Sequence, residues 1–234
     1  MSAQRKTVVV TGAAGQLGRA VAEVFRQRGF NLVLLDRQAD RLASAAADAV
    51  TDALAVPLDL LDRTQVRTAI DQAVARFGGI DVLCHLAGGF RMGEAVHQIS
   101  DASWDFLLDL NARTLVHVAQ AVVPVMLERG CGKIVTVGAG AAQRGAAQMG
   151  AYCASKSALI RLTESMSAEL RDQGINVNCV LPSIIDTPDN RAAMPDADIS
   201  RWVAPAQLAE VIAFLASDAA GAIHGAALPV TGRL

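Results

Sequence analysis

The sequence predicts an α/β fold: a single doubly wound domain with about seven parallel strands and helices on both faces of the sheet. Short β-branched runs alternate along the chain with longer segments of helical periodicity, a pattern typical of repeated strand–helix–strand units. Apolar residues make up 52% of the chain and aromatic residues only 4%, which suits a buried parallel sheet under alanine-rich helices. No linker divides the chain, so we expect residues 1–234 to form one domain.

A glycine-rich turn joins the first expected strand to the first expected helix. Residues 6–10 are a β-branched run, residues 11–18 read TGAAGQLG, and helical periodicity follows from Arg19. Glycines let the backbone approach a pyrophosphate closely, and a helix N-terminus offers unpaired N–H groups. The next strand, 31–35, leads to Asp36, where a carboxylate can bind the adenosine ribose diol. This arrangement predicts a Rossmann domain that binds a dinucleotide.

Asp36 also bears on which dinucleotide is bound. Its negative charge would repel the 2′-phosphate of NADP(H), whereas Arg37 directly after it is able to attract one. We therefore expect NAD(H) to be favoured over NADP(H).

Helices and strands continue to alternate through the middle of the chain. Helical periodicity and β-branched runs follow one another with short connections, which again indicates a parallel sheet. The expected elements are helix 40–50, strand 54–58, helix 62–77 and strand 80–86.

A long helix is expected from about Asp101 to Glu128. Ser100 or Asp101 is a suitable N-cap, and Asn111 lies in an otherwise apolar stretch of the helix. Pro124 should kink this helix or mark its end, because proline has no backbone N–H.

The helix after the strand at 133–137 carries an informative pair of side chains. A loop of small residues at 138–150 leads to Tyr152, and the helix from there runs to about Arg171. Tyr152 and Lys156 are four residues apart, so they share one helix face. A lysine ammonium beside a phenol stabilises the phenolate and lowers the tyrosine pKa from about 10 towards the range useful for proton transfer.

The last part of the chain contains a long segment without clear periodicity. A strand is expected over 175–181, a helix over 206–216 and a final strand over 226–230. Residues 183–204, between the strand at 175–181 and the helix at 206–216, form a loop longer than is common in a compact domain. We interpret this segment as a substrate lid.

With these residues together, the chain resembles the short-chain dehydrogenase/reductase family over nearly its whole length. The glycine turn, the Tyr152 and Lys156 pair, and a turn at Pro182 after the sixth strand carry the resemblance. It implies an NAD(P)(H)-dependent oxidoreductase that transfers a hydride between the nicotinamide and a carbonyl/alcohol substrate. It also implies that Tyr152 is the general acid/base, that Lys156 binds the nicotinamide ribose and lowers the tyrosine pKa, and that Asn111 helps to hold a proton-relay water.

The resemblance also implies a set of cofactor contacts. These contacts follow the cofactor from the pyrophosphate to the carboxamide, with Arg37 beside the adenosine ribose. They are Gly12, Gly15, Leu17 and Gly18 at the pyrophosphate, Asp36 at the adenosine ribose, Asp59 and Leu60 at the adenine, Ala87, Gly88, Tyr152 and Lys156 near the nicotinamide ribose, and Ile185 and Thr187 at the carboxamide end.

The sequence departs from the family pattern at the catalytic serine. That serine stands 13 residues before the tyrosine, and Ala139 occupies the position here. A positioned donor to a developing oxyanion is worth roughly 100- to 1000-fold in rate. Two explanations are open: either a nearby group substitutes, with Gln143, Gln148 and the Cys153 thiol as candidates, or the substrate needs only one donor. The family's Asn-Asn-Ala-Gly motif is also changed, to HLAG at 85–88.

Two alternatives remain open at this point. The first is a resemblance to dihydropteridine reductase, a divergent relative that also lacks the serine. A quinonoid pterin ring spreads charge through a conjugated system, so one proton donor is sufficient for its reduction. The small-residue loop around Ala139 and an aromatic residue, Phe90, after Ala87-Gly88-Gly89 are similar to that branch. A catalytically silent NAD(H)-binding sensor or scaffold is the other alternative.

Charge and composition limit the expected partners. The chain has 21 Lys+Arg and 23 Asp+Glu with no basic cluster, so neither nucleic acid nor an anionic membrane is an expected partner. No apolar run approaches the length of a membrane span, and we expect a cytoplasmic protein. The four cysteines have no metal-type spacing, so no metal is expected. The expected partners are therefore a small-molecule substrate and other copies of the chain. The resemblance implies a homo-oligomer, because in the family the helices at 101–128 and 152–172 form dimer or tetramer contacts.

Overall fold

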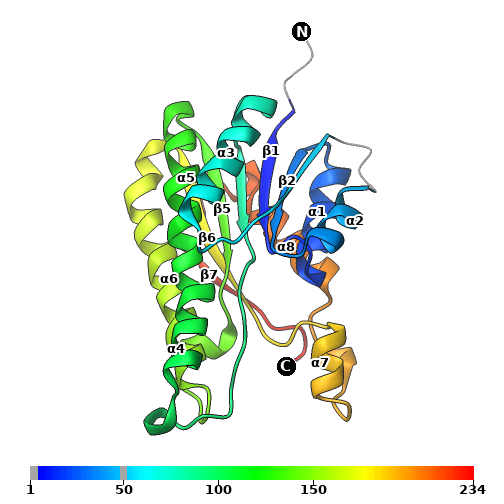
Figure 1. The fold of residues 1–234 in the computed structure, drawn as a ribbon, viewed down its shortest axis with the longest axis vertical. Coiled ribbons are helices and arrows are strands. Elements are labelled where there is room, and N and C mark those ends of the chain that lie inside the picture. The colour runs from blue at the N-terminus through cyan, green and yellow to red at the C-terminus, as the bar shows by residue number, and fades with distance from the viewer. Residues whose placement is uncertain (1–4, 48–51) are drawn as a thin grey trace.

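The structure, a computed structural model, describes residues 5–47 and 52–234, with only the backbone described for 44–47. It confirms the predicted class, because the strands form one seven-stranded parallel sheet with helices on both faces (Figure 1). The strands are β1 (Thr7–Thr11), β2 (Asn31–Asp36), β3 (Ala53–Pro57), β4 (Val82–His85), β5 (Gly132–Val137), β6 (Ile175–Pro182) and β7 (Ala227–Val230). The helices are α1 (Gln16–Gln27), α2 (Ala39–Ala47), α3 (Arg63–Phe77), α4 (Asp101–Leu108), α5 (Thr114–Arg129), α6 (Gly150–Leu170), α7 (Pro188–Ala193) and α8 (Pro205–Leu215).

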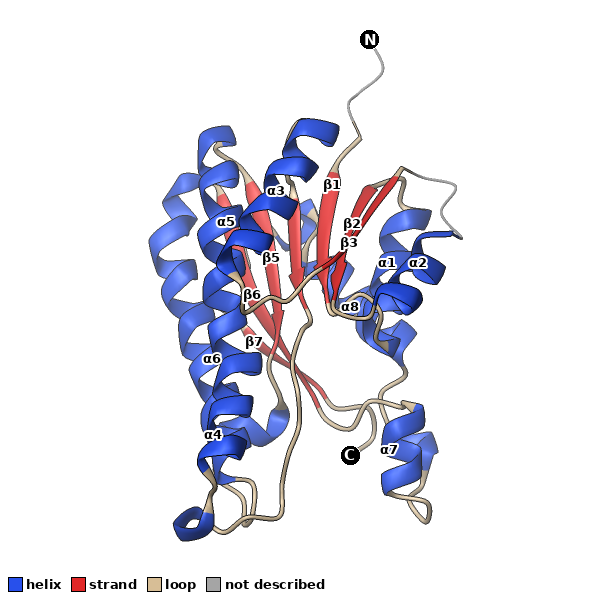
Figure 2. Cartoon of the chain, in the orientation of Figure 1, coloured by secondary structure: helices blue, strands red, loops and turns tan. Residues whose placement is uncertain are grey.

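The strand order brings β1 and β4 together in the middle of the sheet. The order is β3-β2-β1-β4-β5-β6-β7, and all neighbouring strands are parallel (Figure 2). From β1 the chain builds outward through β2 and β3 on one side, and then through β4 to β7 on the other. In such sheets ligands bind at the carboxyl ends of the strands where the order reverses, which here is between β1 and β4.

Successive residues of each strand face opposite helical layers. Val8 and Val10 of β1 pack with α1 and α8, whereas Val9 packs with α3 and α5. All three side chains are fully buried, and burial of each contributes about 1.5–3 kcal/mol of transfer free energy. The sheet is therefore covered on both faces, as its nearly continuous apolar strands predict.

The long middle helix is interrupted by a π-helical turn. α4 ends at Leu108, the π turn spans Asp109–Arg113, and α5 continues through Pro124 to Arg129. Pro124 therefore does not mark the end of the helix, since it removes one backbone donor while the buried Val122 and Met126 beside it keep the helix packed. The break in regular α-helical geometry lies instead at Asn111.

The stretch Asp101–Arg129 is long and apolar enough to cross a membrane by length and composition alone. The expectation from the sequence, that no apolar run approaches the length of a membrane span, is therefore wrong. In the fold, Val118, Val122 and Met126 of this stretch are fully buried in the layer that packs on the sheet beside α3. Core packing accounts for part of its apolarity, since 44% of its apolar segment is buried.

The other predicted helices and strands are present, and their ends differ from the predicted ends by at most three residues. Residues 48–50 of the helix expected over 40–50 lie outside the described residues. The expected lid is more regular than predicted, because 183–204 contains α7 and a 3₁₀ turn at Ile199–Arg201. A β-bridge between Ile185 and Val203 closes its base. In Figure 1, α7 lies below α8 and across from α4.

Candidate active site

The glycine turn after β1 brings the start of α1 close to the sheet. Gly12 has a φ of +67°, a conformation that favours glycine. A Cβ on Gly18 would lie 2.1 Å from the Gly12 carbonyl oxygen, so no larger residue fits where α1 crosses the turn. Gly15 precedes the first residue of α1, and no side chain in the described part of the chain caps the helix with a hydrogen bond. The backbone N–H groups at this end of α1 can therefore face an anionic ligand.

Asp36, at the end of β2, is held against this turn. Its Oδ2 accepts a hydrogen bond from Ala14 N at 3.0 Å, and its Oδ1 accepts one from Gln38 N at 3.0 Å. Each oxygen of an ionised carboxylate accepts more than one hydrogen bond, so the group can still accept from a ribose diol. The carboxylate is thus oriented by two backbone N–H groups.

The loop after β3 forms the adjacent wall. Leu61 N donates to Asp59 Oδ1 at 2.9 Å, which folds the loop back on itself. His117 of α5 is buried, and its Nδ1 donates to the Leu60 carbonyl oxygen at 3.0 Å. These contacts fix the predicted adenine-binding residues against α5.

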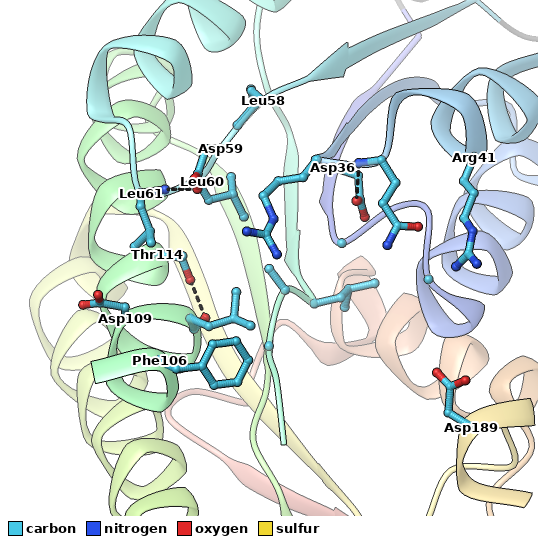
Figure 3. Close-up of a pocket in the computed structure, with 18 residues that line it drawn as sticks. Asp36, Arg41, Leu58, Asp59, Leu60, Leu61, Phe106, Asp109, Thr114 and Asp189 are labelled. Carbon is cyan, nitrogen blue, oxygen red and sulfur yellow. Dashed lines mark hydrogen bonds between the residues drawn. The ribbon is translucent and has the colours of Figure 1, made fainter. Parts of the chain in front are cut away.

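A cavity of about 470 Å³ connects these features, and Figure 3 shows Asp59 and Leu60 on one side and Arg41 and Asp189 on the other. Eight of the predicted cofactor residues line it: Gly12, Gly15, Asp36, Arg37, Asp59, Leu60, Ala87 and Gly88. Its size, the glycine turn and the oriented carboxylate fit a dinucleotide.

Ten further residues line the cavity and were not predicted. Five of them adjoin predicted residues in sequence, whereas the other five come from α2, α4, the π turn, α5 and α7, which no local motif connects to the glycine turn. They are Gln38, Arg41, Leu58, Leu61, Leu86, Phe106, Asp109, Leu110, Thr114 and Asp189.

The predicted residues Asn111 and Lys156 both lie beside Gly88, which lines this cavity. A Cβ on Gly88 would lie 2.9 Å from both Lys156 Nζ and Asn111 Oδ1. Asn111 is fully buried; its Oδ1 accepts from Gly89 N at 2.8 Å, and its Nδ2 donates to Gly89 O and to Ser155 Oγ. Both amide hydrogens are therefore used within the protein, and the Asn111 side chain joins the loop after β4 to α6.

Lys156 is nearly fully buried, and its Nζ donates to the carbonyl oxygen of Val137 at 2.8 Å. Burial lowers the pKa of Lys156 to about 8. The ammonium is thus held between the end of β5 and Gly88.

Tyr152 lies one turn before Lys156 on α6, and the ring of Phe90 contacts its ring edge-on, with centroids 4.8 Å apart and an interplanar angle of 84°. Burial, and secondarily the neighbouring Cys153 thiol, raises the pKa of Tyr152 to about 12. The expected lowering of the tyrosine pKa by Lys156 is not found, because the effect of burial is larger and the Lys156 head group is directed to Val137. The Tyr152 carbonyl oxygen accepts from Ser155 Oγ, which ties it to Asn111.

Ala139, at the position of the family's serine, is buried and follows the end of β5. Of the three side chains considered as substitutes, Gln148 is exposed and lines a separate cavity of about 150 Å³, Gln143 is exposed, and Cys153 is buried. Gln148 has a φ of +60°, so the loop before α6 is strained at that residue.

The remaining predicted cofactor residues do not line the 470 Å³ cavity. Leu17 packs against the apolar core and Gly18 against the turn. At the base of the lid, the Ile185 carbonyl oxygen accepts from Asn190 Nδ2, and Thr187 caps α7 through Asn190 N. Their contacts with a cofactor stay predictions. Within the described residues no group of His, Cys, Asp and Glu could hold a metal ion.

The glycine turn, the oriented carboxylate and the Tyr152 and Lys156 pair near the cavity define a class, the dinucleotide-dependent oxidoreductases with a doubly wound α/β fold. Comparison with known proteins gives the family. Residues 6–198 match the family model described as short chain dehydrogenase, and the chain belongs to this family. It is therefore an NAD(P)-dependent oxidoreductase.

Similar proteins cover nearly the whole chain. Cis-4-hydroxycyclohexanecarboxylate dehydrogenase of Sinomonas cyclohexanicum is 35% identical over 97% of this chain and 95% of its own length. D-threitol dehydrogenase of Mycolicibacterium smegmatis is 33% identical over 97% of this chain and 92% of its own length. The crystal structure of carveol dehydrogenase from Mycobacterium avium in complex with NAD has a TM-score of 0.90 and 27% identity, covering 97% of this chain and 96% of that one.

Proposed function

We propose that this protein is an NAD(H)-preferring enzyme that interconverts a secondary alcohol and its ketone, with Tyr152 as the general acid/base. The observation that carries the proposal is the position of Lys156 Nζ beside Gly88, at the border of the cavity, one helical turn from Tyr152. This arrangement supports the assignment of Tyr152 as the proton-transfer group, next to the site where the nicotinamide ring would lie.

When bound, the nicotinamide cofactor supplies or accepts the hydride. In the direction of reduction, the Tyr152 hydroxyl donates its proton to the carbonyl oxygen as negative charge develops there. A pKa near 12 keeps Tyr152 protonated at neutral pH, which suits a donor. The Lys156 ammonium then stabilises the phenolate electrostatically. In the direction of oxidation, Tyr152 must first lose its own proton, and the resulting phenolate, stabilised by the Lys156 ammonium, accepts the proton of the substrate hydroxyl.

The preference for NAD(H) is supported by the backbone-oriented carboxylate of Asp36, which would repel a 2′-phosphate. Arg37 and Arg41 also line the cavity and would attract one. Measuring Kd for NADH and NADPH at the same ionic strength tests the preference, and tighter binding of NADPH would contradict it.

For the substrate, we propose a cyclic secondary alcohol or its ketone. The name of the relative from Sinomonas cyclohexanicum specifies a hydroxycyclohexanecarboxylate. In this chain the half-exposed Phe90 ring beside Tyr152 would give an apolar wall for a ring.

A second candidate is a quinonoid dihydropterin. Two observations favour it: Ala139 lacks the hydroxyl that would be a second donor, and Phe90 presents an aromatic surface to a planar ring. Because charge spreads through a conjugated ring, one proton donor would be sufficient.

The test is a side-by-side assay of NADH oxidation or NAD⁺ reduction by the purified protein. The panel is cis-4-hydroxycyclohexanecarboxylate, D-threitol, a 3-oxoacyl thioester, cyclic ketones and quinonoid dihydropterin. Tyr152→Phe should lower kcat at least 100-fold on the true substrate while the Kd for NADH stays nearly unchanged, because the hydroxyl acts only in proton transfer. Tight NADH binding with no turnover on any substrate would favour the silent sensor instead. Function in the cytoplasm is part of this proposal.

A further inference from the structure

A buried histidine at the end of β4 lies behind the wall of the cavity. His85 is fully buried between Thr11, at the end of β1, and Thr114, in the first turn of α5. Its Nδ1 is 3.1 Å from Thr11 Oγ1, and its Nε2 is 3.4 Å from Thr114 Oγ1. The reaction proposed above does not use this imidazole.

The hydrogen bonds around Thr11 determine which ring nitrogen carries the proton. Thr11 Oγ1 accepts from Leu86 N at 3.1 Å and from Ala87 N at 3.2 Å, which occupies both of its lone pairs. The Thr11 hydroxyl hydrogen must then be donated to His85 Nδ1. Nδ1 is therefore an acceptor, and the single hydrogen of the neutral ring is on Nε2.

The other end of the ring has the complementary arrangement. His85 Nε2–H points to Thr114 Oγ1, whose own hydroxyl donates to the Leu110 carbonyl oxygen at 2.8 Å. Leu110 lies in the π-helical turn beside Asn111, and both Leu110 and Thr114 line the cavity. One directed chain of hydrogen bonds thus runs from the loop after β4 to the turn that carries Asn111.

We propose that His85 is a positioning residue for catalysis, whose Nε2–H tautomer holds the loop at Ala87 in register with the π-helical turn at Asn111. This inference rests on the proposed function, since the two segments it joins flank Gly88 and the Lys156 ammonium. Burial, together with the positive charge of Lys156, lowers the pKa of His85 to about 3, so the ring stays neutral.

Substitutions at position 85 can keep or remove the hydrogen bonds that the two ring nitrogens make, and so test this role. Asparagine has an amide oxygen that can take the place of Nδ1 and accept from Thr11, but its shorter side chain does not extend to the position of Nε2, so His85→Asn keeps the bond to Thr11 and loses the bond to Thr114. Leucine can make neither bond, so His85→Leu leaves both hydroxyls without their partner. Thr136→Val is the matched control, because Thr136 pairs with His85 in the β4–β5 register and also loses one buried hydrogen bond, that to Thr163.

The first experiment measures the tautomer by ¹⁵N NMR, assigning His85 by comparison with His85→Asn among the four histidines. We expect a neutral Nε2–H ring that does not titrate between about pH 5 and 8. An Nδ1–H ring, or a titration near the ordinary histidine pKa, would overturn the inference. This measurement needs no substrate, so it stands or fails independently of the proposed function.

The second experiment separates catalysis from binding. We expect His85→Leu to lower kcat about 100-fold through misplaced groups, while the Kd for NADH changes less than about threefold because the glycine turn and Asp36 are untouched. His85→Asn should recover kcat to within about tenfold of the wild type, and Thr136→Val should change neither constant. Equal losses in His85→Leu and Thr136→Val, or no recovery in His85→Asn, would show a merely structural role. If His85→Leu does not fold, the His85→Asn kinetics and the tautomer decide.

Discussion

At the scale of single residues, Ala139 is the departure that bears most directly on chemistry. Its backbone is extended, with φ −159° and ψ 145°, and it is followed by a 3₁₀ turn at Gly140–Gln143. Ala139→Ser adds one hydroxyl without changing this backbone. If the substrate is a simple ketone, we expect kcat to rise by about 10-fold or more, because a second donor would stabilise the developing oxyanion. Steady-state assays on a cyclic ketone measure the effect.

The neighbouring glycine supplies the control for that substitution. A Cβ on Gly138 would lie 2.7 Å from Leu181 Cδ2 and 3.0 Å from Cys179 Sγ, so Gly138→Ser should lower Tm without raising kcat. An unchanged kcat in a folded Ala139→Ser variant would mean that another donor already serves the substrate oxygen.

Tyr152 is the only tyrosine in the chain, so its ionisation can be observed directly. Because burial raises its pKa to about 12, the ligand-free protein should show no tyrosinate absorbance through the ordinary titration range near pH 10. If Lys156 turns towards the phenol when NAD⁺ binds, the midpoint should then fall. Ultraviolet difference spectra against Tyr152→Phe measure both states, and a midpoint at or below about 10 in the free protein would contradict the prediction.

The sequence identified chemical groups more reliably than their orientation. Asp36 was predicted from its distance along the chain to the glycine turn, and the structure brings it to that turn through a hydrogen bond from Ala14. The direction of the Lys156 head group was not predictable, because its partner Val137 lies on another element and is reached only after β5 and α6 pack. The contacts of Asn111 with Gly89 and Ser155 likewise depend on three segments meeting.

At the scale of elements, the unit of β1, glycine turn and α1 depends on one close approach. Gly18→Ala would put a Cβ 2.1 Å from the Gly12 carbonyl oxygen, so α1 must move away from the turn. We expect a lower Tm and at least tenfold weaker NADH binding, because the helix N-terminus would no longer be aligned with the pyrophosphate.

Gly15→Ala is the comparison within the same turn. Its Cβ would lie 3.3 Å from the Gly12 carbonyl oxygen, a contact that a small shift can relieve. Thermal unfolding should therefore show a smaller loss of Tm in Gly15→Ala than in Gly18→Ala. Equal losses would mean that the turn tolerates no side chain at either position and that the close approach at Gly18 is not special.

Hydrophobic periodicity predicted most helices and strands but missed two irregular elements. The π-helical turn at Asp109–Arg113 inserts into an apolar pattern that continues on both sides, so no change of period marks it. α7 has six residues, Pro188–Ala193, and is set by the Thr187 cap and Pro188 rather than by an apolar stripe. Both irregular elements adjoin the cavity, where Asp109 and Asp189 are lining residues.

At the scale of the whole molecule, alternating strands and helices were enough to predict the parallel sheet and its two helical layers. The cavity was predictable only in part, because Phe106 and Asp189 reach it from segments that no local motif connects to the glycine turn. Strand order decides this, since the reversal between β1 and β4 determines which loops face each other.

The arrangement of α4, α5 and α6 on one side of the molecule leads to a prediction about assembly (Figure 1). Trp104 and Leu127 are each 41% exposed on the helices that the family resemblance assigns to a subunit contact. We predict a homodimer or homotetramer in which α4, α5 and α6 pack against a second copy, removing this apolar surface from water. Size-exclusion chromatography with light scattering measures the mass.

Substitutions on this face make the prediction specific. Leu127→Glu and Trp104→Glu would bury a charge in an apolar contact, so each should shift the protein towards a smaller species. Gln72→Glu introduces the same charge at an exposed position of α3 and should leave the mass unchanged. If wild type is a monomer at micromolar concentration, or if both Leu127→Glu and Trp104→Glu keep the wild-type mass, the α4–α6 face is not the contact. The apolar surplus of these helices must then be explained by packing within one chain.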